Sequence, residues 1–358
     1  MRATWIICSC AVLLTGAADL DGEQGSSASL FSRDQPSCFG LVPWAGTLLV
    51  RTDPPCLLDP DNGTTRLLEL PEDDHLLAVA EQGAAPLALC STADHRLLLL
   101  EKEEQGWKDR RMPASTFDDE APAVALAADP TLVVVLTSRC LQRFEGGEWT
   151  TIAARRIGHE RDGIFEPMPR RSFLQGRRLF LGYDDGEWGG DLTALDVDTG
   201  RMLEVQAGMD GREEDPVRCL QSDRHGSLWC VRGFAHGPGL SGALYRLDGA
   251  RWTLIASSDN YPLDESDGRG GDWDQAATEF DAVAFDEEDS AYLLTGTLGL
   301  LKRCSSGGWS RLTPGWPNFV YVHDLVVQKG CAVIDAGDSG ILLLRLDDGS
   351  LRRATWPR

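Results

Sequence analysis

The chain has 358 residues, of which 42% are hydrophobic and 25% are charged, so it is long enough to bury a large core. Its formal net charge of −22 argues against nucleic acid or an anionic membrane surface as the partner, because both require concentrated positive charge. Length alone allows one large domain or two ordinary ones.

Residues 1–18 have the pattern of a secretory signal peptide. One basic residue is followed by a short apolar core and by small residues that end in Gly16-Ala17-Ala18, and the apolar run is too short for a membrane anchor. Residues 19–37 are polar and rich in Gly and Ser, which is typical of a flexible linker. We therefore expect cleavage near Ala18, a secreted or periplasmic location, and no transmembrane segment in the mature chain.

From about Cys38 onward, the sequence repeats a unit of four short strands, named a to d in chain order. The stretch VRCLQSDRHGSLWCVRGFAHGPGLSGALYRLDGARW, residues 217–252, shows the unit most clearly. Alternating apolar residues run up to the turn 223–226, and a second apolar run follows it. The turn 248–250 then separates a third run from a fourth that opens at Trp252. The period of two and the turn residues predict four antiparallel strands.

Seven such units are expected along the chain. They span about residues 46–70, 76–112, 124–153, 172–205, 217–252, 280–312 and 322–356. Their number and length predict an all-β fold, a β-propeller of seven four-stranded blades that forms one domain over residues 38–358. An eight-bladed ring is the alternative if the first region holds an additional blade. A tryptophan opens strand d in several units (Trp107, Trp149, Trp252 and Trp309), and we expect it to pack between blades.

The cysteines predict disulfides, because eight of the ten lie beyond residue 18 of a chain that we expect to be secreted. Buried free thiols are the alternative. In the a–b hairpin of the fifth unit, a turn centred between residues 224 and 225 places Cys219 directly opposite Cys230, which predicts a disulfide between them. A bulge in that turn would shift the register by one residue and put the two side chains on opposite faces of the sheet.

The connections between the strands differ in length. Those from d to a and from b to c carry the insertions, at residues 154–171, 205–216, 233–242, 257–279 and 313–321. Both kinds of connection emerge on the same face of a propeller, and binding residues collect in long loops on a rigid scaffold. We therefore expect the long-loop face to carry the ligand. Arginine pairs such as Arg170-Arg171 are interpreted as local ion-pairing partners for the acidic loops.

The 257–279 insertion is acidic and rich in glycine, with Asp264, Asp267 and Asp272 among its carboxylates. Closely spaced carboxylates on a flexible loop are typical of Ca²⁺ sites, although the spacing departs from the EF-hand rule. A solvated acidic loop is the alternative interpretation.

Histidines and aromatic residues also fall in or near the long loops. His159, His236 and His323 are candidate catalytic residues, because a histidine pair with a carboxylate binds a divalent ion or serves as acid and base. Trp188, Trp273 and Trp316 are candidate ligand-binding residues, because aromatic rings beside charged groups suit glycan or peptide recognition. Surface histidines and loop packing are the simpler alternatives.

The fifth unit also carries a family resemblance. Its patterns Leu220-x-x-Asp223-x-x-Gly226-x-Leu228-Trp229 and Leu-Tyr-Arg-Leu-Asp-Gly-x-x-Trp resemble the propeller repeat of periplasmic two-component-regulator sensors. The sixth unit, with TGTLGL before Trp309, is similar. This resemblance implies a propeller. Streptogramin lyases, which use histidines, are more distantly similar seven-bladed propellers and imply an enzymatic alternative.

These features favour a secreted β-propeller that acts as a binding module through its long-loop face, for a small-molecule, glycan or protein ligand. A metal-assisted propeller lyase or hydrolase is the alternative. Convergent histidine and carboxylate side chains in the central mouth would favour the enzyme. A broad aromatic face with scattered titratable groups would favour binding.

Overall fold

The structure is a computed structural model. It describes residues 40–355 except 45–46, 53, 72–74, 83–84, 93–95, 104–105, 114–122, 138–139, 154–168, 185, 187–188, 210, 237–238, 259–277, 297, 314–321 and 338–339. The expected signal peptide, residues 1–18, and the expected linker, residues 19–37, lie outside the described residues.

The first four sheets each contain four consecutive strands. The first blade consists of β1 (Leu41–Trp44), β2 (Thr47–Val50), β3 (Cys56–Leu58) and β4 (Thr65–Leu67). The second consists of β5 (His75–Gln82), β6 (Ala85–Ser91), β7 (Leu97–Glu103) and β8 (Gly106–Asp109). The third consists of β9 (Ala123–Ala128), β10 (Leu132–Thr137), β11 (Cys140–Glu145) and β12 (Glu148–Ala153). The fourth consists of β13 (Arg171–Gln175), β14 (Arg178–Gly182), β15 (Leu192–Asp196) and β16 (Met202–Leu203).

The last three sheets follow the same order. The fifth blade consists of β17 (Val217–Ser222), β18 (Leu228–His236), β19 (Gly239–Asp248) and β20 (Arg251–Ser257). The sixth consists of β21 (Phe280–Phe285), β22 (Ala291–Thr295), β23 (Gly299–Arg303) and β24 (Trp309–Arg311). The seventh consists of β25 (Asp324–Gln328), β26 (Cys331–Asp335), β27 (Ile341–Arg345) and β28 (Leu351–Arg353).

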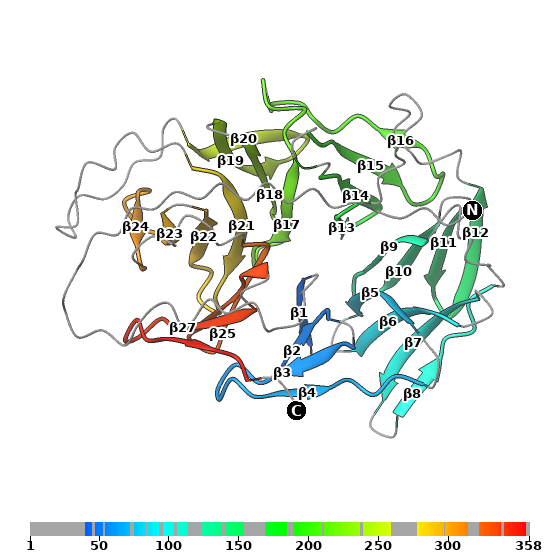
Figure 1. The fold of residues 1–358 in the computed structure, drawn as a ribbon. Coiled ribbons are helices and arrows are strands. Elements are labelled where there is room, and N and C mark those ends of the chain that lie inside the picture. Colours follow the sequence, from blue (N-terminus) through cyan, green and yellow to red (C-terminus); the bar gives the residue numbers. More distant parts are fainter. Residues whose placement is uncertain are drawn as a thin grey trace, which may run out of the picture.

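The seven sheets form a ring, which confirms the predicted seven-bladed β-propeller (Figure 1). All pairs within the blades are antiparallel, and the first strands of successive blades contact one another around the ring, from β1 through β25 and back to β1. The first strand of each blade is therefore the inner strand, and the seven inner strands surround a central channel. No helix among the described residues is long and apolar enough to span a membrane.

The hydrophobic core lies between neighbouring blades. One cluster packs β17 and β18 of the fifth blade against the sixth and seventh blades, through residues such as Trp229, Leu293 and Ile334. Other clusters join the third blade to the fourth, the fourth to the fifth, and the seventh to the first. Each sheet is thus buried on both faces, because a single blade has no core of its own.

Three of the four predicted tryptophans join blades through both packing and hydrogen bonds. The indole Nε1 of Trp107 donates to Glu69 O at 2.7 Å, that of Trp149 to Arg110 O at 3.1 Å, and that of Trp252 to Val205 O at 2.7 Å. Each acceptor lies just after the outer strand of the preceding blade. At these three positions the tryptophan therefore forms a hydrogen bond between blades in addition to its apolar packing.

The end of the chain closes the ring on the first blade. Past β28, Thr355 forms a parallel bridge with Thr64, with Thr65 N donating to Thr355 O at 3.1 Å and Thr355 N donating to Gly63 O at 2.9 Å. In Figure 1 the red strands of the last blade lie beside the blue strands of the first. None of the described strands is exchanged between blades, so in the described part of the chain closure rests on this short latch and on the apolar cluster beneath it.

The predicted disulfide between Cys219 and Cys230 is wrong, because both thiols are free. Cys219 faces Val231 and Cys230 faces Leu220, so the two side chains lie on opposite faces of the sheet and belong to different core clusters. The reason is the turn: the Ser222–Leu228 pair closes five residues, with Asp223 N bonded to Ser227 O at 3.0 Å, rather than the four assumed. That extra residue shifts the register by one.

The b-to-c insertion of the fifth blade, residues 233–242, is also different from the expected loop. β18 and β19 remain paired across it as far as His236 and Gly239. Its glycines allow close packing, since a Cβ at Gly233 would lie 2.1 Å from Phe280 O and one at Gly242 would lie 2.5 Å from the Phe280 ring. The glycines therefore mark the approach of the next blade, and not a loop.

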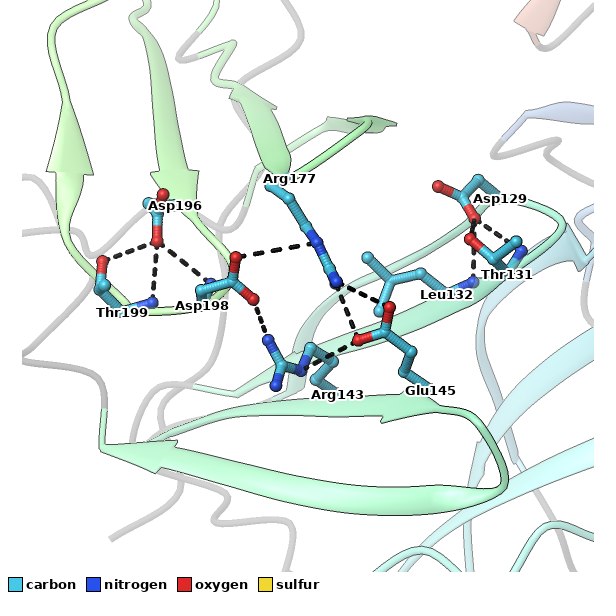
Figure 2. A network of polar contacts seen from close by, with 9 residues as sticks. All are labelled: Asp129, Thr131, Leu132, Arg143, Glu145, Arg177, Asp196, Asp198 and Thr199. Atoms are coloured by element: carbon cyan, nitrogen blue, oxygen red, sulfur yellow. Dashed lines mark hydrogen bonds and ion pairs between the residues drawn. The ribbon is translucent and has the colours of Figure 1, made fainter.

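On the face of the tight turns, charged side chains link the third and fourth blades (Figure 2). Arg177 donates to both carboxylate oxygens of Glu145, at 2.9 and 2.7 Å, and Arg143 pairs with Asp198. Asp196 holds the Asp198 turn by accepting from the backbone and hydroxyl of Thr199. Further turn-to-turn bonds continue around this face, from Gln175 to Gly226, Arg224 to Asp289, Lys329 to Glu287 and Lys329 to Asp61.

Candidate functional site

The central channel contains a cavity of about 620 Å³, which the inner strands of all seven blades line. Its walls combine apolar side chains, such as Val79, Phe173 and Phe285, with polar groups that include Ser172 and Gln221. Charged side chains are confined to its two ends. This volume falls within the range of small-molecule sites, roughly 300–1,000 Å³.

One end of the channel carries a cluster of charged residues, here named the mouth cluster. It comprises Arg51, Arg170, Arg171, Asp184, Arg218, Glu279, Asp281, His323 and Asp324. Most of these residues directly follow a long d-to-a connection, where the chain enters an inner strand. The connections before β13, β17, β21 and β25 therefore lead into one site, which is contributed by five of the seven blades.

Arg171 spans the channel from the fourth blade to the seventh. Its Nε donates to Arg218 O in the fifth blade at 3.0 Å, and its Nη2 donates to His323 O in the seventh blade at 3.0 Å. The same nitrogen lies 3.5 Å from the Asp324 carboxylate. Because the fourth and seventh blades are not neighbours in the ring, this guanidinium crosses the mouth.

Arg170 and Arg218 share a buried carboxylate. Asp184, whose side chain is 1% exposed, pairs with Arg170 and accepts a hydrogen bond from Arg218 Nη1 at 2.9 Å. Arg170 Nη2 also lies 3.3 Å from His323 Nδ1. Two adjacent arginines of the fourth blade thus both reach the seventh blade.

An extra residue in several inner strands shapes the mouth. The strand register shifts at Leu77, Val124, Arg218 and Asp281, at equivalent positions of four blades. Such bulges re-aim side chains and free a backbone group from the ladder. The carbonyls at two of them accept arginine: Arg51 Nη2 donates to Leu77 O at 2.9 Å, and Arg171 donates to Arg218 O.

Burial, together with the neighbouring charges, shifts the pKa values of three groups at the mouth. Burial, together with Arg170, Arg218 and Arg171, lowers the pKa of His323 to about 4, so its imidazole is neutral at neutral pH. Burial and the nearby Glu279 raise the pKa of Asp281 well above its ordinary value. Its Oδ2 has no hydrogen-bond partner among the described residues. Burial also raises the pKa of Glu279.

Of the residues predicted from the sequence, the structure brings only His323 into the mouth. His236 is the last residue of β18, and its side chain is not among the described ones. The other candidates, namely His159, Trp188, Asp264, Asp267, Asp272, Trp273 and Trp316, lie outside the described residues. Among the residues that the structure describes, no group of three or more His, Cys, Asp or Glu side chains is placed to hold a metal ion.

Sequence reasoning missed the arginines. Arg170 and Arg171 do form ion pairs, as expected, but with Asp184 and Asp324 at the channel mouth. The available signal was their position: each follows a long insertion and stands at the entry to an inner strand, as Arg218 does. Charged residues at equivalent entries of several blades predict a common site.

Comparison with known proteins identifies the fold. No protein-family model and no curated protein matches the chain. Among solved structures, it is similar to the extracellular domain of the one-component system BT4673 from B. thetaiotaomicron, with 10% identity and a TM-score of 0.52 over 86% of this chain and 38% of that one. The extracellular domain of the hybrid two-component system BT3049 from the same source matches with 13% identity and a TM-score of 0.51, over 87% of this chain and 40% of that one.

A third similar structure is YCF48 from Cyanidioschyzon merolae, with 8% identity and a TM-score of 0.53 over 86% of this chain and 95% of that one. The chain spans about two fifths of the length of the two sensor structures. At these identities the likeness shows the fold alone. It agrees with the propeller that the resemblance to two-component-regulator repeats implies.

Proposed function

We propose that the chain is a secreted binding module that holds its ligand at the mouth of the channel, on the face of the long connections. The observation that carries this proposal is the mouth cluster. Buried charged groups are costly to a fold and concentrate at functional sites. Here five blades contribute them to one end of one cavity.

The setting and the ligand belong to the same proposal. The two sensor structures that resemble the chain are extracellular domains, and a secreted location would place this chain in a similar setting. A glycan or a peptide would contact Trp188, Trp273 and Trp316, the ligand-binding residues predicted from the sequence. Calcium bound by Asp264, Asp267 and Asp272 is part of the same proposal, and a native-mass and metal-content measurement tests that part.

The enzymatic alternative is less well supported by the mouth. His323 does lie beside carboxylates, as a metal-assisted lyase or hydrolase that uses His159, His236 and His323 would require. However, its neighbours include three arginines, which disfavour a divalent cation, and Asp184 and Asp324 are already paired with them. A pKa of about 4 also makes His323 a weak general base at neutral pH.

The test is a binding screen on glycan and peptide arrays with matched variants. Trp273→Ala and Trp316→Ala are expected to reduce the signal of wild-type hits at least tenfold, because a buried aromatic contact is worth about 1.5 kcal/mol or more. Arg177→Gln, on the opposite face, is expected to leave it unchanged. Cross-linking of a hit to the tight-turn face that bears His225 would contradict the proposal.

A further inference from the structure

The turn between β3 and β4 of the first blade carries a modification pattern. It contains Asn62-Gly63-Thr64, which is the one Asn-x-Ser/Thr pattern in the sequence. This pattern is the acceptor signal for N-linked glycosylation in proteins that enter a secretory compartment. A structural explanation also exists, because Asn-Gly suits a tight turn. The hydrogen bonds around Asn62 separate the atoms that the turn uses from those that it does not.

The turn uses the side-chain oxygen of Asn62. This Oδ1 accepts from Thr64 N at 2.8 Å and from Thr64 Oγ1 at 2.6 Å. The backbone closes the turn separately, with Gly63 N donating to Asp59 O at 2.8 Å. Gly63 has a φ of +74°, which favours glycine. The turn therefore requires an acceptor on the side chain at position 62 and a glycine after it.

Two other blades build the same turn without an asparagine. In the seventh blade, Gly349 N donates to Arg345 O at 3.0 Å. Asp348 Oδ1 there accepts from Ser350 N at 2.8 Å, as Asn62 does in the first blade. In the fourth blade, the Thr199 hydroxyl accepts from the backbone two residues further on, at 3.4 Å. An aspartate or a threonine thus serves the fold equally, so the turn does not explain the amide nitrogen of Asn62.

That amide nitrogen keeps one hydrogen available for substitution. Asn62 is exposed, and among the described residues its Nδ2 has one hydrogen-bond partner, Asp59 Oδ2, at 2.6 Å. A primary amide carries two hydrogens on its nitrogen. Replacement of the second hydrogen by a sugar keeps the donor to Asp59 and both bonds that Oδ1 accepts. The turn can therefore carry a glycan without losing a hydrogen bond.

The surroundings of the turn are charged and open to solvent. Asp61 pairs with Lys329 at 3.2 Å, and both side chains are largely exposed. Arg352 Nη2 donates to Asp61 O at 2.7 Å. The turn also lies on the tight-turn face, away from the mouth cluster. A bulky, polar glycan at Asn62 would extend a solvated surface and leave the face of the long connections free.

We propose that Asn62 is a site of N-linked glycosylation when the chain passes through a compartment that holds a lipid-pyrophosphate-linked glycan and its transferase. Asn62 Nδ2 attacks the anomeric carbon of the donor sugar and forms the new carbon–nitrogen bond. The bond from that carbon to the pyrophosphate oxygen breaks, the lipid pyrophosphate leaves with the electron pair, and Nδ2 loses one proton. The proposal rests on the secreted location in the proposed function, and the experiment separates the two.

The experiment is expression of the full chain in a eukaryotic secretory host. The chain is expressed with its own residues 1–18 and, separately, with a strong signal peptide in their place. The product is treated with peptide-N-glycosidase in heavy-oxygen water, digested and analysed by mass spectrometry. This enzyme converts a glycosylated asparagine to an aspartate that contains heavy oxygen, whereas earlier spontaneous deamidation of Asn62 leaves ordinary oxygen. We expect most of the peptide that contains residue 62 to carry the heavy label.

Matched variants locate the acceptor and test the host. Thr64→Ala keeps Asn62 and removes the hydroxyl of the pattern, so the label is expected to disappear, whereas Thr64→Ser is expected to retain it. Asp348→Asn creates Asn-Gly-Ser in the corresponding turn of the seventh blade, and a second glycan is expected there. Protein retained inside the cells is analysed in the same way, so a variant that does not fold still reports on glycosylation.

Two results would overturn the proposal. One is an unlabelled Asn62 in secreted wild-type protein while a glycoprotein of the host is modified in the same cells, whether or not Asp348→Asn gains a glycan. The other is a label that persists in Thr64→Ala. A labelled Asn62 with the strong signal peptide, together with no secretion through residues 1–18, would instead reject the secreted location and keep Asn62 as the acceptor.

Discussion

Trp252 and Trp309 form a natural pair for measuring the cross-blade hydrogen bond. Both open the outer strand of their blade, and their exposed fractions are 1% and 0%. Trp252 Nε1 donates to Val205 O at 2.7 Å, and its ring packs edge-on against Phe180 with centroids 6.4 Å apart. Trp309 Nε1 has no acceptor among the described residues. The two sites are thus matched in burial and differ in one bond.

Substitution by phenylalanine at each site removes the same atoms and leaves a comparable gap. We expect Trp309→Phe to lower the free energy of unfolding by about 1–2 kcal/mol through lost burial and packing. Trp252→Phe also deletes a buried hydrogen bond and leaves the Val205 carbonyl without its indole partner, which adds about 1 kcal/mol or more. The expected total at Trp252 is about 2–3 kcal/mol.

Equilibrium urea unfolding, followed by fluorescence and by far-ultraviolet circular dichroism, measures both values, provided that the m-values of the variants agree. Trp107→Phe, which removes another cross-blade bond, is a further comparison. Equal losses at Trp252 and Trp309, or a larger loss at Trp309, would show that the indole bond contributes nothing measurable to blade association.

Four further predictions concern the mouth, the latch and the thiols. The pKa of His323 is about 4 in the folded chain, and its ordinary value is 6.5. Between these two pH values the unfolded chain binds more protons, so the free energy of unfolding decreases as pH drops through this window. His323→Gln should make this decrease smaller in urea titrations at a series of pH values. Asp281 has the opposite sign, because a raised pKa lowers stability as pH rises, and Asp281→Asn should therefore stabilise the fold at pH 7 to 8 in the same assay. Deleting residues 352–358 removes the latch bonds and should destabilise the ring by about 2–4 kcal/mol, whereas an unchanged melting temperature would mean that the apolar cluster alone closes it. Alkylation of the denatured, unreduced protein should label both Cys219 and Cys230 as free thiols, and recovery of either in a disulfide would contradict the observed register.

The fold was predictable from the sequence because its signals are local. In the fifth unit, the turn residues before Ser227 and the alternation on either side mark a hairpin within a few residues, and each blade repeats the pattern. The Asp223 carboxylate shows why the motif recurs. It accepts from Ser227 N at 2.8 Å and from Trp229 Nε1 at 3.0 Å, and Asp286 likewise accepts from Ser290 N and Tyr292 in the sixth blade.

The register of the hairpin was harder to predict, since it depends on how many residues the turn closes. Asp223 and Gly226 are compatible with turns of four or five residues, and the difference moves every side chain to the other face. The Asp223 side chain stabilises the longer turn through its bond to Ser227 N. The Cys219–Cys230 prediction failed at this step, while the position of the turn itself was correct.

The mouth cluster shows the limit of local reasoning. Arg171 owes its role to Arg218 O and His323 O, which lie 47 and 152 residues away in sequence. Only the closed ring brings these groups together, because the fourth and seventh blades do not touch as neighbours. The bulge at Arg218 adds a second condition, since it frees the carbonyl that Arg171 uses. A propeller mouth is therefore specified by positions that recur at the entry of each inner strand, and comparing the residues at that one position across all blades is the way to detect it from a sequence.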